Sequence, residues 1–202
     1  MDIDAFNTSL VGRLASIVML PDTPVKAAWL EAFSRWVDNG YKVTEGTGPC
    51  FKSDGTVFHH RRHYPAYAVD GFSGGAVNAV WLLSKTQFAV SAESHAVLKR
   101  ALLEMRFYCN LRSFPLALSG RHPDGRGELV PWHYARLAVA GTPDGRGEID
   151  RSWPPPTCVW PKEKTLIRGC SPKRASLPNL RLRGTASTAT MPRCRTGAPT
   201  GW

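Results

Sequence analysis

The sequence predicts a mostly α-helical protein. Apolar residues recur at helical spacing in several segments before residue 150, and no segment shows the apolar–polar alternation typical of strands. An apolar fraction of 43% in 202 residues is enough to bury a core. We therefore expect a helical region over residues 1–150, followed by a Pro- and Arg-rich basic tail over residues 151–202.

Three segments carry the helical pattern most clearly. The first covers residues 24–38 and is followed by an Asn-Gly pair, a typical helix stop. The second covers residues 75–84 and the third residues 92–109, while residues 128–139 are a candidate for a fourth helix. The apolar side chains at helical spacing, which we expect in the core, are Trp29, Leu30, Phe33, Trp36 and Val37, then Ala76, Val77, Val80, Trp81 and Leu83, and finally Val97, Leu98, Ala101, Leu102, Met105 and Tyr108.

The net charge of +10 is concentrated at one end of the chain. Residues 151–202 hold ten basic residues and one acidic residue, a net +9, which leaves +1 for residues 1–150. One interpretation is a disordered basic arm that binds nucleic acid. The other is a frameshifted translation, because DNA encoding the Ser-Trp-Pro-Pro-Pro segment from residue 152 can encode Met-Ala-Ala-Ala when it is read one base earlier. The nucleotide sequence distinguishes the two interpretations.

Several functional classes are disfavoured. No apolar run has the roughly 20 residues of a membrane span, and the N-terminus lacks the pattern of a signal peptide. Five cysteines are an odd number, which excludes complete disulfide pairing, and we expect Cys50 and Cys109 to be structural thiols. The chain has neither a Gly-rich phosphate loop nor a nucleophile-elbow serine.

The stretch between the first two predicted helices is rich in Gly, Pro and His, and we expect an ordered loop there. Histidine titrates near neutral pH, and a nearby cation lowers the pKa of a tyrosine, so the combination suits acid–base chemistry on an anionic substrate. Metal binding and an ordinary surface loop are the alternatives; we predict no metal site, because the cluster lacks a nearby acidic or Cys ligand. The cluster comprises His59, His60, Arg61, Arg62, His63, Tyr64 and Tyr67.

A second candidate lies after the third predicted helix, in the segment Gly120-Arg121-His122. An arginine held in such a turn can pair bidentately with a carboxylate or sulfate, and an ordinary solvated arginine is the alternative. The motif PDGRGE, which occurs at residues 123–128 and again at 143–148, is turn chemistry that we expect to connect helices.

Taken in order, several segments resemble the chondroitin sulfate ABC lyases, within the glycosaminoglycan polysaccharide lyases that also include chondroitin AC and hyaluronate lyases. The resemblance covers roughly residues 20–150. The seven-residue spacing from His60 to Tyr67 is that of the ABC-type enzymes, so we prefer His60 to its neighbour His59 as the family's histidine. The resembling residues are Lys52–Thr56, His60, Tyr64-Pro65, Tyr67, Ala79–Leu83, Thr86–Val90 and Leu116–Pro123.

This resemblance implies β-elimination of uronic acid-containing glycosaminoglycans: chondroitin or dermatan sulfate, and hyaluronan as a further candidate. It also implies part of an incomplete α/α toroid without the family's β-sandwich domains. By the family pattern, Tyr67 would take the C5 proton of the uronate and His60 would lie at its carboxylate. Arg121 would lower the Tyr67 pKa and hold the anionic intermediate. The family's catalytic Glu has no counterpart before the chain ends.

The resemblance also predicts the partners. We expect an anionic glycosaminoglycan substrate, and neither nucleic acid nor a membrane. The sequence shows no required cofactor, a divalent cation stays an alternative, and no oligomeric state is predicted. The family implies a secreted or periplasmic protein, and a non-catalytic carbohydrate-binding fragment is the alternative function. The residues expected to bind substrate are His59, Arg61, Tyr64 and His122.

Overall fold

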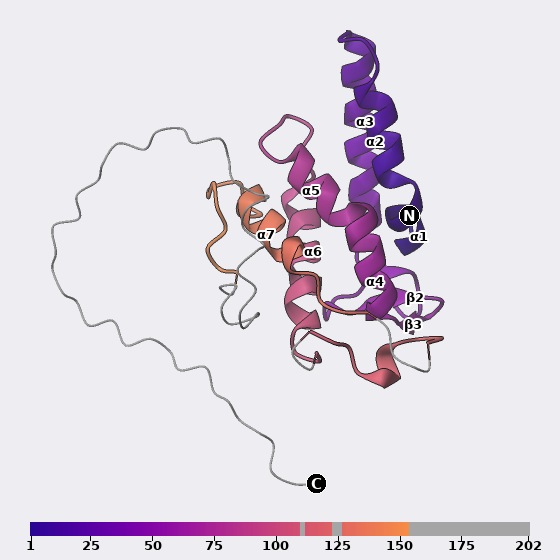
Figure 1. Cartoon of the computed structure of the whole chain (residues 1–202). Coiled ribbons are helices and arrows are strands. Elements are labelled where there is room, and N and C mark those ends of the chain that lie inside the picture. The colour runs from indigo at the N-terminus through magenta and orange to yellow at the C-terminus, as the bar shows by residue number, and fades with distance from the viewer. Residues whose placement is uncertain (110–111, 123–126, 154–202) are drawn as a thin grey trace, which may run out of the picture. The chain divides into compact units, whose positions relative to one another are not determined.

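The computed structural model describes residues 1–109, 112–122 and 127–153 (Figure 1). Most of the ordered elements are helices, which confirms the predicted mostly α class. The tail expected from residue 151 lies outside the described residues from Pro154 onward. In chain order the elements are α1 (Ile3–Thr8), α2 (Leu10–Val18), α3 (Pro24–Tyr41), β1 (Cys50–Phe51), β2 (Val57–His59), β3 (Arg62–His63), α4 (Pro65–Gly71), a π-helical segment (Phe72–Ala76), α5 (Val77–Leu83), α6 (Ala92–Met105), a 3-10 turn (Leu116–Leu118) and α7 (Pro131–Ala140).

The four predicted helices are present as α3, α5, α6 and α7. Helix α3 begins at a proline, whose missing N–H costs nothing in the first turn. Helix α6 begins after Ser91, whose side chain accepts a hydrogen bond from the backbone N–H of Ser94. It ends at Met105, four residues before the expected end. Helix α7 ends at Ala140 and is capped by Gly141, where φ is +101°.

The region between the first two predicted helices is more regular than expected. It contains α4 and a three-stranded antiparallel sheet in the order β1-β2-β3, where we expected an ordered loop. The strands have only two or three residues, too few to show an alternating pattern. Helices α1 and α2, which pack against each other, were not predicted either.

An aromatic cluster joins α1, α3, β1 and the π-helical segment. The Phe6 ring lies 5.1 Å from that of Tyr41, and Phe51 lies 5.6 Å from Tyr41 and 6.0 Å from Phe72. All four side chains are essentially inaccessible to solvent. The Tyr41 hydroxyl also donates a 2.6 Å hydrogen bond to the Ala76 carbonyl oxygen, so its polar atom is satisfied inside the core.

Two glycines let α1 lie directly against the π-helical segment. A Cβ at Gly74 would come within 2.5 Å of the Asn7 carbonyl oxygen, and one at Gly75 within 2.6 Å of the Phe6 carbonyl oxygen. Helix α1 also packs against α4, and Figure 1 shows α1 and α4 at the end of the helices where the small sheet lies. Side chains on α1 can therefore reach those on α4.

The predicted core is largely confirmed, with one clear exception. Phe33 and Val37 of α3 are buried, as are Leu98 and Met105 of α6. The Trp29 side chain, by contrast, is 55% exposed, so its placement in the core was wrong. Helical spacing identifies a face of α3 but does not reveal how much of that face its neighbours cover.

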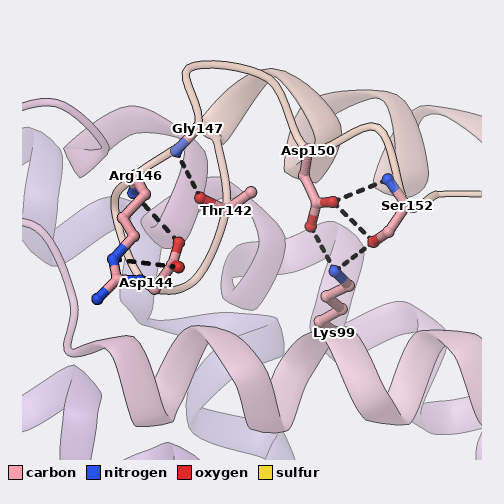
Figure 2. A network of polar contacts seen from close by, with 7 residues as sticks. All are labelled: Lys99, Thr142, Asp144, Arg146, Gly147, Asp150 and Ser152. Atoms are coloured by element: carbon pink, nitrogen blue, oxygen red, sulfur yellow. Dashed lines mark hydrogen bonds and ion pairs between the residues drawn. The ribbon is translucent and has the colours of Figure 1, made fainter.

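A polar network fastens the segment after α7 to α6 (Figure 2). The Lys99 ammonium lies 2.5 Å from Asp150 Oδ2 and 2.6 Å from Ser152 Oγ. The second PDGRGE copy forms a turn in which the Gly147 N–H donates to Thr142 Oγ1 over 2.7 Å. This copy forms a turn after α7, the last described helix, so a connection to a further helix stays a prediction, and part of the first copy lies outside the described residues.

The two cysteines in the described part of the chain are free thiols. Burial raises the pKa of both Cys50 and Cys109 to about 12, which fits the structural role predicted for them. None of the described helices combines the length and apolar character needed to cross a membrane.

Candidate active site

The hairpin β2–β3 presents two of the candidate residues at its tip. Phe58 pairs with His63 and His59 with Arg62, which leaves His60 and Arg61 as a two-residue turn. Both have positive φ, +50° and +60°, as a type I′ turn requires. This conformation costs a non-glycine residue roughly 1 kcal/mol. The two side chains are exposed, so they are available to a ligand.

Next to the hairpin lie two tyrosines about one turn apart, Tyr64 at the N-cap of α4 and Tyr67 within the helix. The ring of His59 stacks on that of Tyr67, with centroids 4.4 Å apart and planes 13° apart. Tyr64 lies 6.2 Å from His59 and 5.7 Å from Tyr67. His60 contacts His59, ring to ring, at 3.8 Å. The structure thus brings four of the predicted site residues together, with His59 rather than His60 on Tyr67.

Two residues of α1 complete the surroundings of Tyr67. The Tyr67 hydroxyl donates a hydrogen bond to Asp4 Oδ1 and accepts one of 3.4 Å from the Asn7 amide. Asp4 Oδ1 also lies 3.7 Å from Nε2 of His59. Asp4 and Asn7 were not predicted, although the sequence carries a signal for them. Asp2 is a typical N-cap residue, and positions three apart share one face of a helix.

Arg121 reaches the site through the glycine that precedes it. At Gly120 φ is +64°, and a Cβ there would lie 2.2 Å from Cζ of Tyr64, so the loop backbone touches the edge of that ring. The exposed Arg121 guanidinium is close enough to contribute to lowering the pKa of His59. His122 follows in the same loop, half-buried, and its backbone N–H donates to the Ser119 carbonyl oxygen.

The electrostatics of Tyr67 differ from the expectation. We expected Arg121 to lower the pKa of Tyr67, but that pKa is raised, which is a correction to the prediction. The main cause is the hydrogen bond to Asp4; burial and the negative charges of Asp4 and Asp70 add to it, while the Asn7 hydrogen bond opposes it. A phenol that donates to a carboxylate loses its proton less easily.

The pKa of His59 is shifted in the direction that favours the neutral imidazole. Burial lowers its pKa, and the charges of His60 and Arg121 lower it further, against the opposing charge of Asp4. Near neutral pH the site therefore combines a neutral imidazole with a protonated phenol. A neutral imidazole can accept a proton and a protonated phenol can donate one, so the pair offers both kinds of group that acid–base catalysis uses.

An open hollow of about 670 Å³ lies beside this cluster. That volume is within the range of known ligand pockets. Within the part of the chain that the structure describes, no three His, Cys, Asp or Glu side chains gather as metal ligands. The hollow is lined by Asp2, Asp4, Thr47, Gly48, Pro49, His59, His60 and Arg61.

Comparison with known proteins identifies the family of this chain. The family model described as "Lyase, catalytic" matches residues 1–154, so the chain belongs to this family of lyase catalytic domains.

Its relatives include two chondroitin sulfate ABC exolyases. The protein from Bacteroides thetaiotaomicron is 55% identical over 151 residues, 75% of this chain and 15% of that protein. The exolyase from Proteus vulgaris is 40% identical over 149 residues, 74% of this chain and 15% of that protein. A chondroitin sulfate ABC endolyase from Proteus vulgaris is 31% identical over 148 residues, 71% of this chain and 14% of that protein. These matches confirm the resemblance, and the chain spans about 15% of the length of these relatives.

Proposed function

We propose that the protein carrying this sequence is a lyase that cleaves uronic acid-containing glycosaminoglycans by β-elimination. The 55% identity over 151 residues to a chondroitin sulfate ABC exolyase carries this proposal, and the family model of lyase catalytic domains matches residues 1–154, which include the candidate site. In this proposal the described helices belong to an α/α toroid and line one side of its substrate cleft. The polymeric substrate places the reaction outside the cytoplasm, in a secreted or periplasmic protein.

The reaction removes the C5 proton of the uronate and expels the oxygen at C4. The C5–H bond is a weak acid while the adjacent carboxylate keeps its full charge, so the site must offset that charge with positive groups or hydrogen-bond donors. His60 and Arg61 at the exposed hairpin tip, with Arg121 from the loop after α6, are the groups that we assign to this task. His59, Tyr64 and His122 are assigned to binding the neighbouring sugar rings and sulfates.

Tyr67 is the base in this proposal. As its own phenol proton passes to a neighbouring base, its oxygen takes the C5 proton, the C5–H electrons form the C4=C5 double bond, and the glycosidic C4–O bond breaks. The leaving oxygen then takes a proton from the Tyr67 hydroxyl, and the phenol proton returns to Tyr67. All of these steps use side chains of this chain and no cofactor.

Replacement of the proposed base is the direct test. Tyr67→Phe should lower the rate of product formation, measured as the increase in absorbance of the unsaturated uronide, by at least about 100-fold, as expected for loss of a general base. The substrate is chondroitin sulfate, and the assay uses the full-length protein that carries this sequence. Tyr108→Phe is the matched control, because it removes a hydroxyl that contacts His63 rather than the α1–α4 cluster.

Near-normal turnover by Tyr67→Phe would contradict the proposal. Binding of chondroitin sulfate by the wild type without any unsaturated product would also contradict it, and would favour a non-catalytic carbohydrate-binding protein.

A further inference from the structure

The Tyr67 hydroxyl is engaged before any substrate arrives. It donates a hydrogen bond to Asp4 Oδ1 and accepts a weak hydrogen bond of 3.4 Å from the Asn7 amide. A phenol oxygen has two lone pairs, so one stays available to a further donor. The oxygen can therefore accept a proton from a substrate only if its own proton moves toward Asp4.

The surroundings of Tyr67 oppose a free phenolate. The groups that face it are Asp4 and Asn7 from α1, His59 from β2 and Asp70 from its own helix. The pKa of Tyr67 is raised, first by the hydrogen bond to Asp4. Near neutral pH the residue is thus a neutral phenol, and its oxygen alone is a poor base.

Helix α1 carries Asp4 to this position through close packing. The Gly74 and Asn7 contact holds α1 against the π-helical segment that continues α4. The Asp4 side chain is 48% exposed and borders the hollow, and its Oδ1 also lies 3.7 Å from Nε2 of His59. One carboxylate therefore contacts both rings of the stacked His59–Tyr67 pair.

We propose that Asp4 is the positioning residue for Tyr67, accepting its phenol proton while the Tyr67 oxygen takes the C5 proton of the uronate. The inference rests on the proposed lyase function. The C5–H bond breaks as a new O–H bond forms on Tyr67, and the original phenol O–H bond breaks as one forms on Asp4. When the glycosidic C4–O bond breaks, Tyr67 protonates the leaving oxygen and Asp4 returns the proton to Tyr67, so that the protein ends unchanged.

The test compares Asp4→Asn with the wild type, with Asp4→Glu as the conservative variant. The assay again uses chondroitin sulfate and the full-length protein. Asp4→Asn should lower kcat by about 10²–10⁴-fold near neutral pH with little change in KM, because an amide cannot accept the proton. Asp4→Glu should restore part of kcat. The control Asp22→Asn removes an exposed carboxylate that pairs with Lys26, and should match the wild type.

The pH profile separates this role from a structural one. Without Asp4, Tyr67 must first ionise in order to act as a base, so the kcat of Asp4→Asn should rise with pH and the gap to the wild type should narrow. A purely structural defect would leave a gap that is independent of pH. Wild-type kcat and an unchanged pH profile in Asp4→Asn, together with an inactive Tyr67→Phe, would overturn the inference and leave the lyase proposal intact.

A titration without substrate tests the same contact independently of activity. With ring-labelled tyrosine, and the Tyr67 signal assigned from Tyr67→Phe, NMR should show a lower Tyr67 pKa in Asp4→Asn than in the wild type. An unchanged pKa would overturn the role of Asp4. A wild type inactive on chondroitin sulfate would instead overturn the lyase function on which the inference rests, and the titration would still decide whether Asp4 controls Tyr67.

Discussion

Gly120 is the residue at which the loop after α6 contacts Tyr64, the N-cap residue of α4. Its φ of +64° lies in the left-handed region, and its backbone touches the edge of the Tyr64 ring. Any side chain would have to displace that ring, which is itself buried against His59 and Tyr67. The absence of a side chain here therefore sets the position of Arg121.

We predict that Gly120→Ala destabilises the fold through this contact. A Cβ 2.2 Å from the Tyr64 ring cannot be accommodated without movement, and such overpacking costs about 1–3 kcal/mol. The left-handed conformation adds roughly 1 kcal/mol. The free energy of unfolding, measured in urea, should fall by the sum of these two costs.

Gly46→Ala is the control, because Gly46 has a φ of +54° and no atom within 4 Å of a Cβ built there. Gly46→Ala should lower the free energy of unfolding only by the roughly 1 kcal/mol that the left-handed conformation costs. Equal losses in the two variants would contradict a steric role for Gly120.

His59 and His60 illustrate how two adjacent residues acquire different surroundings. In a hairpin the last strand residue can face the core, whereas the turn residue projects outward. His59 is accordingly buried and stacked on Tyr67, while His60 lies at the exposed tip with a φ of +50°. His59 is thus the histidine in contact with Tyr67, whereas the His60 side chain stays exposed to solvent.

At the scale of elements, α1 is the helix on which the surroundings of Tyr67 depend. It has only six residues and little helical stability of its own, so its position comes from packing. The glycines of the π-helical segment allow its backbone to approach closely enough for Asp4 to contact Tyr67. π-helical turns are often found at functional sites.

We predict that Gly74→Ala separates α1 from α4. The new Cβ would lie 2.5 Å from the Asn7 carbonyl oxygen, a backbone atom that moves only with the helix. The free energy of unfolding should fall by about 1–3 kcal/mol. The Tyr67 pKa, followed by NMR, should also fall toward its usual value as the Asp4 contact weakens.

Gly12→Ala, on α2, is the matched control. Nothing lies within 4 Å of a Cβ built at Gly12, so alanine should raise stability, by up to about 1 kcal/mol, and leave the Tyr67 pKa unchanged. If Gly74→Ala behaved in the same way, close packing of α1 would not be what positions Asp4.

At the scale of the whole described region, the Lys99–Asp150 pair joins the last described segment to α6 (Figure 2). Burial alone would raise the pKa of Asp150, but hydrogen bonds from Lys99 and Ser152, with the Lys99 charge, outweigh it and lower the pKa. The Asp150 side chain is 2% exposed, so an unpaired charge there is costly. Trp153 packs on the same helix, with the Lys99 ammonium 5.6 Å from its ring centroid.

We predict that Lys99→Met destabilises the protein in a pH-dependent way. At pH 7 the loss should be about 3–5 kcal/mol, because a buried carboxylate is left without its cation. The folded pKa of Asp150 lies below the unfolded value, so the stabilisation is complete above about pH 4 and is lost as pH falls through the folded pKa. The difference between wild type and variant should therefore shrink in acid.

Thermal unfolding at a series of pH values measures this difference. Lys26→Met, which breaks an exposed pair with Asp22, is the control and should change stability much less. A pH-independent loss in Lys99→Met would show that packing of the lysine stem, rather than its charge, stabilises the segment.

Much of the fold could be predicted from the sequence because long amphipathic helices carry their signal locally. Helices α3 and α6 have 18 and 14 residues, long enough to repeat their apolar spacing several times. Strands of two or three residues and the six-residue α1 are too short for any periodicity. Their formation depends on partners distant in the chain.

The candidate site likewise has one part that the sequence predicts and another that depends on the tertiary structure. The sequence by itself determined the cluster from His59 to Tyr67 and the Gly120-Arg121 loop, because those residue types lie close together in the chain. Only the tertiary structure decided that Asp4, 63 residues before Tyr67, accepts a hydrogen bond from its hydroxyl, and that the Tyr67 pKa is therefore raised. Hydrogen bonds and electrostatic shifts depend on distances between groups in space, and close packing at two glycines sets these distances.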